Sequence, residues 1–122
     1  LFQVSRDHSF VEELLAMGGI TPEEARTHPR ANVITRAVGA GEELVLDLDI
    51  FELQHGDLLL LCSDGLYKEL EDREIGALMA RSDSPALIAQ NLIGACLERR
   101  ARDNVTVVVV RVVSPASTKE HP

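Results

Sequence analysis

Two aspartates at the boundaries of strongly apolar stretches are the residues of this 122-residue chain best suited to chemistry. Asp64 follows the apolar run 58–62, which predicts a short strand buried on both faces. Asp103 precedes a second run, 105–113, whose many β-branched residues predict another buried strand. A carboxylate at the end of a buried strand serves as a turn cap, as a catalytic acid or base, or as a metal ligand.

If the two predicted strands run antiparallel in one sheet, the end of the first lies beside the start of the second. Asp64 and Asp103 would then meet at one edge of the sheet. Two like charges repel there unless one carboxylate takes up a proton or a cation lies between them. Asp-Gly and Asp-Asn are also ordinary turn sequences, and spacing alone favours two unrelated turns over a site.

The composition indicates one globular domain with an aliphatic core, because hydrophobic residues make up 45% and aromatic residues only 3%. A net charge of −8 argues against binding to nucleic acid or to an anionic membrane surface. No apolar run approaches the roughly 20 residues of a membrane span, and no signal peptide is recognised. Cys62 and Cys96 lack a metal-ligand spacing, so we expect small buried side chains in a cytoplasmic protein.

Capping signals predict two short helices near the start of the chain. Ser9 with Glu12 opens the first, which is expected to end at the glycine pair 18–19. Thr21 and Pro22 open the second, which is expected to stop before residue 29.

Two further helices are predicted in the second half. Asp72 is the expected cap of one, and Ser84 followed by Pro85 is the expected cap of the other. The cluster of Arg99, Arg100 and Arg102 is expected to satisfy the C-terminal end of the last helix by its charge.

Apolar and polar residues alternate at 1–6, 32–38 and 44–53, which predicts additional strands. The turn at 55–57 is expected to join the last of these to 58–62 as a hairpin. Strands in antiparallel runs with helices in pairs predict an α+β fold with helices packed on a sheet. Residues 114–122 are polar, contain two prolines and are expected to be a disordered tail. The start without Met, inside an apolar-polar stretch, predicts a fragment cut within a domain.

Four motifs occur along the chain in the order Arg6-Asp7-His8-Ser9, residues 32–39, residues 61–66 and Asp103-Asn104-Val105-Thr106. Together they closely resemble the C-terminal half of the metal-dependent protein phosphatase (PPM) family, the 2C-type serine/threonine phosphatases. Residues 21–26 resemble the flap of the bacterial branch. The resemblance covers residues 1–113 and implies an α-β-β-α sandwich of antiparallel sheets flanked by helices, with a flap at about 12–36 that shapes substrate access.

The resemblance also implies a binuclear Mg²⁺ or Mn²⁺ centre in the complete domain. Asp64 and Asp103 match two of its ligands, and Gly65 and Asn104 match neighbours that support them. The centre would activate a water that hydrolyses phosphoserine or phosphothreonine in a protein substrate, so no catalytic residue beyond the metal ligands is expected. The family's N-terminal half, with its remaining ligands, is absent from these 122 residues, which are therefore expected to be inactive alone.

Two alternatives stay open at this point. One is a non-catalytic phosphatase-like module that binds a signalling partner such as a kinase, although the retention of both aspartates argues against it. The other is a strand-exchanged homodimer that covers the open sheet edge.

The remaining polar residues of the motifs are expected to be structural. Asp7 and His8 fall in this group, and Ser9 is accounted for as a helix cap. Arg36 is expected in a buried ion pair, while His28 and His55 lie next to turns and are expected to be solvated.

Overall fold

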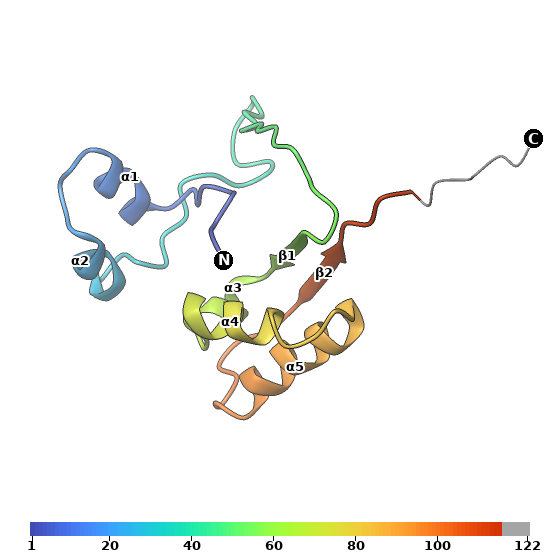
Figure 1. Cartoon of the computed structure of the whole chain (residues 1–122). Helices are drawn as coiled ribbons and strands as arrows, with labels where there is room; N and C mark the ends of the chain where they lie inside the picture. The colour runs from blue at the N-terminus through green and yellow to red at the C-terminus, as the bar shows by residue number, and fades with distance from the viewer. Residues whose placement is uncertain (116–122) are drawn as a thin grey trace, which may run out of the picture. The chain divides into compact units, whose positions relative to one another are not determined.

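The computed structural model describes residues 1–115, which divide into two compact units (Figure 1). One unit comprises residues 3–49, and the other comprises residues 1–2 together with the chain from Ile50 onwards. The predicted tail disorder falls mostly on residues 116–122, which lie outside the described residues. Ser114, inside the described part, donates its backbone N–H to Nδ1 of His55 at 2.9 Å, and His55 is exposed, as expected.

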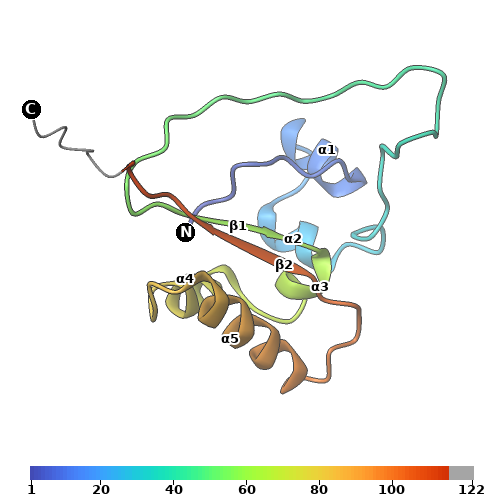
Figure 2. The same cartoon turned by 90° about the vertical axis from the view of Figure 1, so that its right-hand side faces the viewer.

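The unit that begins at Ile50 contains the two strands predicted beside the aspartates. Strands β1 (Leu58–Cys62) and β2 (Val107–Arg111) pair antiparallel, with Cys62 opposite Val107 (Figure 2). Backbone hydrogen bonds extend the ladder beyond both ends, from Gly56 N to Val112 O at 2.8 Å and from Ser63 N to Thr106 O at 2.9 Å. The start of β2 therefore lies beside the end of β1, as the sequence predicted.

Three helices follow this strand pair in space: α5 (Pro85–Leu97) packs on β2, and α3 (Asp64–Tyr67) and α4 (Asp72–Met79) pack against α5. Figure 2 shows α4 and α5 on the same side of β1 and β2. The core between them is aliphatic, as the composition predicted, and its buried members are Leu66, Leu70, Ile75, Met79, Ile88, Leu92 and Cys96. From the sheet, Leu58 and Leu60 of β1 and Val107 and Val109 of β2 pack against this cluster.

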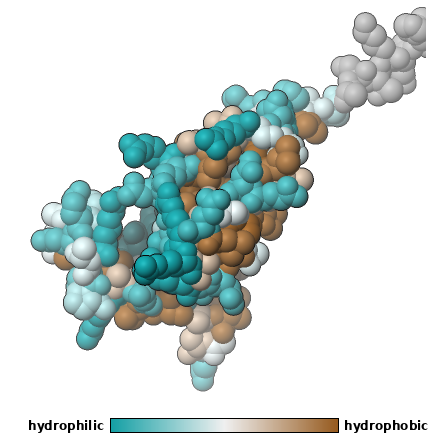
Figure 3. Space-filling view, turned by 90° about the horizontal axis from the view of Figure 1, so that it is seen from below, coloured by the Kyte–Doolittle hydropathy of each residue, from teal (hydrophilic) through white to brown (hydrophobic). Residues whose placement is uncertain are grey.

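The opposite face of the sheet is exposed, so the prediction of strands buried on both faces is wrong. Leu61 is 59% exposed and Val108 is 52% exposed. Cys62 is exposed as well, against expectation, whereas Cys96 is fully buried as expected. For Leu61 and Val108 the physical reason is that helices cover only one side of the strand pair within the described residues. Cys62 pairs with Val107 on the helix-facing side and is exposed at the end of its strand. Leu97 of α5 is also exposed, and Figure 3 shows a broad hydrophobic surface on the face seen from below.

The unit of residues 3–49 contains α1 (Phe10–Ala16) and α2 (Pro22–Thr27), and its capping signals are confirmed. Ser9 Oγ accepts from Glu12 N at 3.3 Å. Thr21 Oγ1 accepts from Glu24 N at 3.2 Å, while Glu24 Oε2 accepts from Thr21 N at 2.7 Å, which completes a capping box.

The strands predicted at 1–6, 32–38 and 44–53 are not formed. The region keeps one isolated antiparallel bridge, between Ser9 and Ile34. The turn before β1 is present, with Gly56 at φ +92° and Asp57 N bonded to Gln54 O at 3.1 Å, but the segment before it pairs with no strand among the described residues. A strand exists only through hydrogen bonds to a partner strand, so alternation alone leaves 44–53 extended and exposed.

Helix starts in the second unit need one correction. The residue before α4 is Glu71, whose backbone N–H donates to Glu74 Oε2 at 2.9 Å, and Asp72 is the first helical residue and not the cap. Ser84 caps α5 as predicted, because its Oγ accepts from Leu87 N at 3.4 Å.

Helices packed on an antiparallel strand pair confirm the α+β class. Within residues 1–115, no helix is long and apolar enough to cross a membrane.

Candidate metal centre

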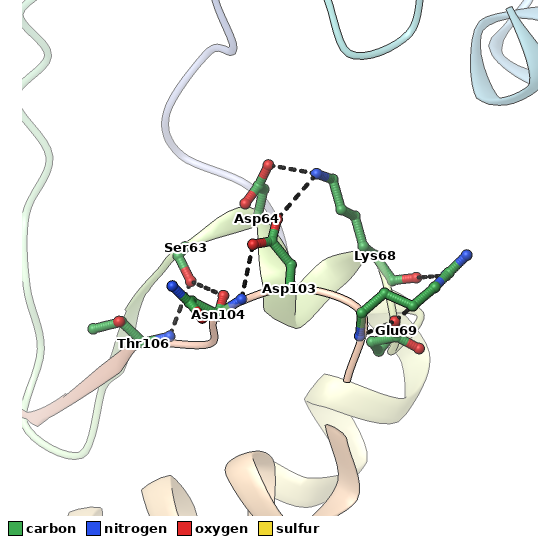
Figure 4. Close-up of polar contacts among 8 residues, drawn as sticks. Ser63, Asp64, Lys68, Glu69, Asp103, Asn104 and Thr106 are labelled. Atoms are coloured by element: carbon green, nitrogen blue, oxygen red, sulfur yellow. Dashed lines mark hydrogen bonds and ion pairs between the residues drawn. The ribbon is translucent and has the colours of Figure 1, made fainter. Parts of the chain in front are cut away.

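The carboxylates of Asp64 and Asp103 converge on one ammonium group, as Figure 4 shows. Lys68 Nζ lies 2.7 Å from Asp64 Oδ2 and 3.5 Å from Asp103 Oδ2. Asp64 is the first residue of α3, directly after β1, and Asp103 lies in the loop that enters β2. The predicted convergence is therefore present, with a lysine as the cation between the two acids.

Ser63 joins the two chain segments that carry the aspartates. Its Oγ accepts from Thr106 N at 2.9 Å and lies 3.3 Å from Asn104 O, to which it donates. These bonds continue the strand pairing past its last regular residue pair, so the start of α3 stays attached to the loop at 103–106 (Figure 4).

Gly65 permits the close approach that brings the aspartates together. It is buried in α3, and a Cβ placed on it would lie 2.2 Å from Asn104 O and 3.2 Å from Cγ2 of Val105. No side chain fits at that distance from a backbone oxygen. The sequence Asp64-Gly65 is thus explained by contact with a segment distant along the chain and not by turn conformation.

The loop before β2 is held by its own short contacts. Asp103 Oδ1 accepts from Asn104 N at 2.8 Å, which fixes the carboxylate against the loop backbone. Arg102 Nε donates to Glu69 Oε1 at 2.9 Å, and its Nη2 donates to Lys68 O at 3.3 Å. The Glu69 side chain is only 7% exposed, and its bond to Arg102 is the main cause that lowers the pKa of Glu69.

Arg99 makes the second link between the end of α5 and the helices before it. Its Nη1 donates to Glu69 O and to Glu74 Oε2, both at 2.9 Å. The hydrogen bond from Arg99 is the main cause that lowers the pKa of Glu74 to about 2. The expectation that this arginine cluster only satisfies a helix terminus is wrong, because Arg99 and Arg102 both reach back to the α3–α4 segment.

Electrostatics at the aspartates favour a bound cation. The hydrogen bond to Asp64 is the main cause that raises the pKa of Lys68; burial opposes the rise and Asp103 adds to it. Both carboxylates are about half exposed, so ions from solvent reach them. Carboxylate oxygens are ligands that Mg²⁺ and Mn²⁺ prefer.

The donor set fits part of a metal centre. Among residues 1–115, no group of three or more His, Cys, Asp and Glu side chains is arranged to hold a metal ion. Asp64 and Asp103 therefore supply two carboxylates, and further ligands would have to come from water or from additional chain.

The remaining motif residues form a separate cluster in the unit of residues 3–49. His8 Nε2 lies 2.6 Å from Asp47 Oδ2, and Arg36 Nη1 lies 3.1 Å from Asp47 Oδ1. The bond to His8 is the main cause that lowers the pKa of Asp47, and the bond to Arg36 follows. Arg36 thus forms the expected ion pair, but the pair is exposed and not buried.

His28, which was expected to be solvated, is half-buried and has side-chain partners. Its ring lies 5.7 Å from that of Phe10, and its Nδ1 accepts from Arg30 N at 3.0 Å.

Lys68 is the site residue that sequence reasoning missed. The signal was present, because Lys68 follows Asp64 by four residues and side chains at that spacing meet on a helix.

Comparison with known proteins gives a consistent result. A family profile described as "Stage II sporulation protein E (SpoIIE)" matches residues 20–113. Protein phosphatase PhpP of Streptococcus pneumoniae is 38% identical over 108 residues, which are 88% of this chain and 44% of that protein. Serine/threonine protein phosphatase PstP of Mycobacterium tuberculosis is 42% identical over 113 residues, which are 93% of this chain and 22% of that protein.

Solved structures resemble this chain over the same region. The PstP crystal structure superposes with a TM-score of 0.84 at 39% identity and covers 93% of this chain and 47% of that one. Stp1 of Staphylococcus aureus gives a TM-score of 0.84 at 38% identity, with 93% and 44% covered. A structure of the PstP catalytic domain in complex with two manganese ions gives 0.77 at 39% identity, with 92% and 45% covered. The chain spans less than half the length of each of these relatives.

Proposed function

This chain belongs to the metal-dependent (PPM) family of bacterial protein serine/threonine phosphatases, and we propose that it is the C-terminal part of a domain that hydrolyses phosphoserine and phosphothreonine in proteins. The observation that carries the proposal is the convergence of Asp64 and Asp103 on one cation at the strand ends. Their separation along the chain makes two unrelated turns a poor explanation of that geometry.

In this proposal Asp64 and Asp103 hold Mg²⁺ or Mn²⁺ through carboxylate oxygens. A bound metal pair would lower the pKa of a water molecule so that it attacks phosphorus. The chain's own contribution is positional. Gly65 allows the Asn104 backbone to approach α3, and Asn104 N donates to Asp103 and so orients that carboxylate. No side chain of this chain is assigned a proton transfer.

We further propose that the complete domain is the α-β-β-α sandwich of the family, in which a second sheet covers the exposed face of β1 and β2. Leu61, Val108 and Val110 support this, because apolar side chains on an exposed sheet face gain free energy when covered. The role of residues 12–36 as a flap that governs substrate access is proposed from the resemblance alone.

The same exposed face favours the two alternatives, a partner-binding module and a strand-exchanged homodimer. Sedimentation equilibrium of the 122-residue chain tests the strand-exchanged homodimer, whereas the phosphatase assays below test the non-catalytic module. A fragment that awaits its own N-terminal half sediments as a monomer at low micromolar concentration, whereas strand exchange gives a dimer.

Calorimetric titration with Mn²⁺ tests the metal site. We expect Asp64→Asn and Asp103→Asn each to abolish the binding heat seen with the unmodified chain. Asp72→Asn is the matched control, since Asp72 is also the first residue of a helix but takes no part in the Lys68 ion pairs. Equal heats in all four proteins would refute the site.

Phosphatase assays test the reaction. With a phosphothreonine peptide and Mn²⁺, we expect the chain alone to give background rates, because it supplies two carboxylates. Addition of the N-terminal half of a relative such as PstP should restore hydrolysis. Robust Mn²⁺-dependent hydrolysis by the 122 residues alone would contradict the proposed division of ligands.

A further inference from the structure

We propose that Lys68 is a built-in competitor of the metal: its ammonium group occupies the space between Asp64 and Asp103 and leaves when a divalent cation binds. The inference rests on the proposed function, since it concerns the same two carboxylates. It adds a residue that sets how tightly the site holds its metal.

The contact geometry places the ammonium where a bridging cation would lie. Lys68 Nζ contacts one oxygen from each carboxylate, Oδ2 of Asp64 at 2.7 Å and Oδ2 of Asp103 at 3.5 Å (Figure 4). The other oxygen of Asp103 is engaged by Asn104 N at 2.8 Å. Lys68 therefore binds the Asp103 oxygen that the loop backbone does not engage.

The lysine side chain is free to leave without any change of fold. The backbone of Lys68 is fixed at both polar groups, since its N–H donates to Asp64 O at 3.0 Å and its carbonyl accepts from Arg102 Nη2 at 3.3 Å. The side chain is 37% exposed and carries its ammonium group on a flexible four-carbon stem. Exposed ion pairs of this kind are weak, so a divalent cation displaces the ammonium readily.

Two neighbouring acidic side chains already have a cationic partner. Glu69 is paired with Arg102, and Glu74 is paired with Arg99. In the metal-free chain Lys68 thus cancels the repulsion between the two aspartates and links α3 to the loop before β2. Lys68 stabilises the pair of aspartates without metal, and the same ion pairs lower the affinity of the site for a metal ion.

Calorimetric titration of the 122-residue chain with Mn²⁺ at low ionic strength tests the inference. For Lys68→Met and Lys68→Gln we expect a dissociation constant about three- to tenfold lower than that of the unmodified chain, because competition and charge repulsion are both removed. Lys68→Arg keeps a cation at this position and should bind Mn²⁺ no more tightly than the unmodified chain. Arg81→Met removes the same charge outside the ion pairs and should leave the affinity unchanged.

Thermal unfolding supplies a second readout that does not depend on catalysis. Without metal, Lys68→Met should melt lower than the unmodified chain, and Mn²⁺ should raise its melting temperature by more. Added salt should shrink both differences, because it screens exposed charges.

The outcomes separate this inference from the proposed function. Equal Mn²⁺ affinities for the unmodified chain, Lys68→Met and Lys68→Gln would overturn the role of Lys68 and leave the metal site intact. Absence of Mn²⁺ binding in every variant would overturn the metal site and the role of Lys68 together. Tighter binding by Arg81→Met as well would assign the effect to net charge and overturn the inference.

Discussion

The two units of this chain are built in opposite ways. The unit from Ile50 onwards joins two strands that are distant in sequence and buries seven apolar side chains beneath them. In the unit of residues 3–49, the buried apolar residues are Val11 and Ala25, and its helices are defined by capping bonds within three residues. Local signals thus suffice to start short helices, but they do not bury a core.

The difference matters for the candidate site. Asp64 and Asp103 belong to the unit with the core, where a sheet ladder and a close backbone approach fix their positions. Asp47 with His8 and Arg36 forms an equally well-connected ion cluster in the other unit, but without an underlying core. Precision at a site comes from the buried scaffold and not from the number of ion pairs.

The largest expected effect comes from removing core volume. Leu92→Ala should lower the free energy of unfolding by about 2–5 kcal/mol, because Leu92 is fully buried and the change leaves a cavity. Leu46→Ala, at a side chain that is 66% exposed, should change it by less than about 0.5 kcal/mol. Urea unfolding followed by far-UV circular dichroism measures both, and similar losses would show that 44–53 is buried in solution.

Gly65→Ala tests the close approach at the site. The added Cβ would meet Asn104 O, so we expect a loss of about 1–3 kcal/mol in unfolding free energy and weaker Mn²⁺ binding. Gly94→Ala is the matched control, since Gly94 lies inside α5 with no atom within 4 Å of an added Cβ, and it should gain up to about 1 kcal/mol. A neutral Gly65→Ala with unchanged Mn²⁺ affinity would refute the role given to this glycine.

Loss of a cap should affect the two units unequally. Thr21→Ala removes one bond of a capping box and should cost α2 about 0.5–2 kcal/mol, because little burial compensates. Ser84→Ala removes the cap of α5, yet Ile88 and Leu92 anchor that helix in the core. Amide hydrogen exchange should therefore show faster exchange throughout α2 but only at the first turn of α5. Equal loss of protection along both helices would contradict the comparison.

The smallest effect is expected from acid. The pKa of Glu74 is lowered from 4.5 to about 2, so its bond to Arg99 contributes stability that is complete above about pH 4.5 and is lost as the pH falls towards 2. The pKa of Asp47 is also lowered, so its contribution likewise disappears on acidification. Asp47 is exposed and Glu74 is partly exposed, so solvent weakens both ion pairs and keeps the effects small.

Urea unfolding at several pH values measures this dependence. Glu74→Gln should reduce the loss of unfolding free energy at low pH in the unit that begins at Ile50. Asp47→Asn should reduce that loss in the unit of residues 3–49. If neither substitution changes how the unfolding free energy falls at low pH, the loss of stability is due to other carboxylates.

Several features of the fold and site were predictable because they depend on neighbouring residues. The caps at Ser9, Thr21 and Ser84 follow from side chains that reach backbone amides three residues away. The positions of β1 and β2 follow from continuous apolar runs, and an antiparallel pairing of those runs already placed Asp64 near Asp103. The resemblance to a phosphatase family then predicted that these carboxylates are metal ligands.

Other features depended on partners that the pattern does not specify. The alternation at 44–53 shows that a strand would be half-buried, but it supplies no neighbouring strand, and the segment remains extended. The runs at β1 and β2 indicated burial on two faces, whereas one face is exposed. The ion pairs of Arg99 with Glu74 and of Arg102 with Glu69 were likewise not predictable from the pattern, because the partners lie about a quarter of the chain apart.

The sequence by itself determined where α1, α2 and α5 start, where the two central strands lie, and that an acid stands at the end of one strand and at the start of the other. These properties are local, since each is set by side chains within a few residues. Only the tertiary structure decided that Lys68 is the cation between the acids and that Gly65 contacts Asn104. Those contacts join segments that meet only after the strands have paired, and their distances follow from the register of that pairing.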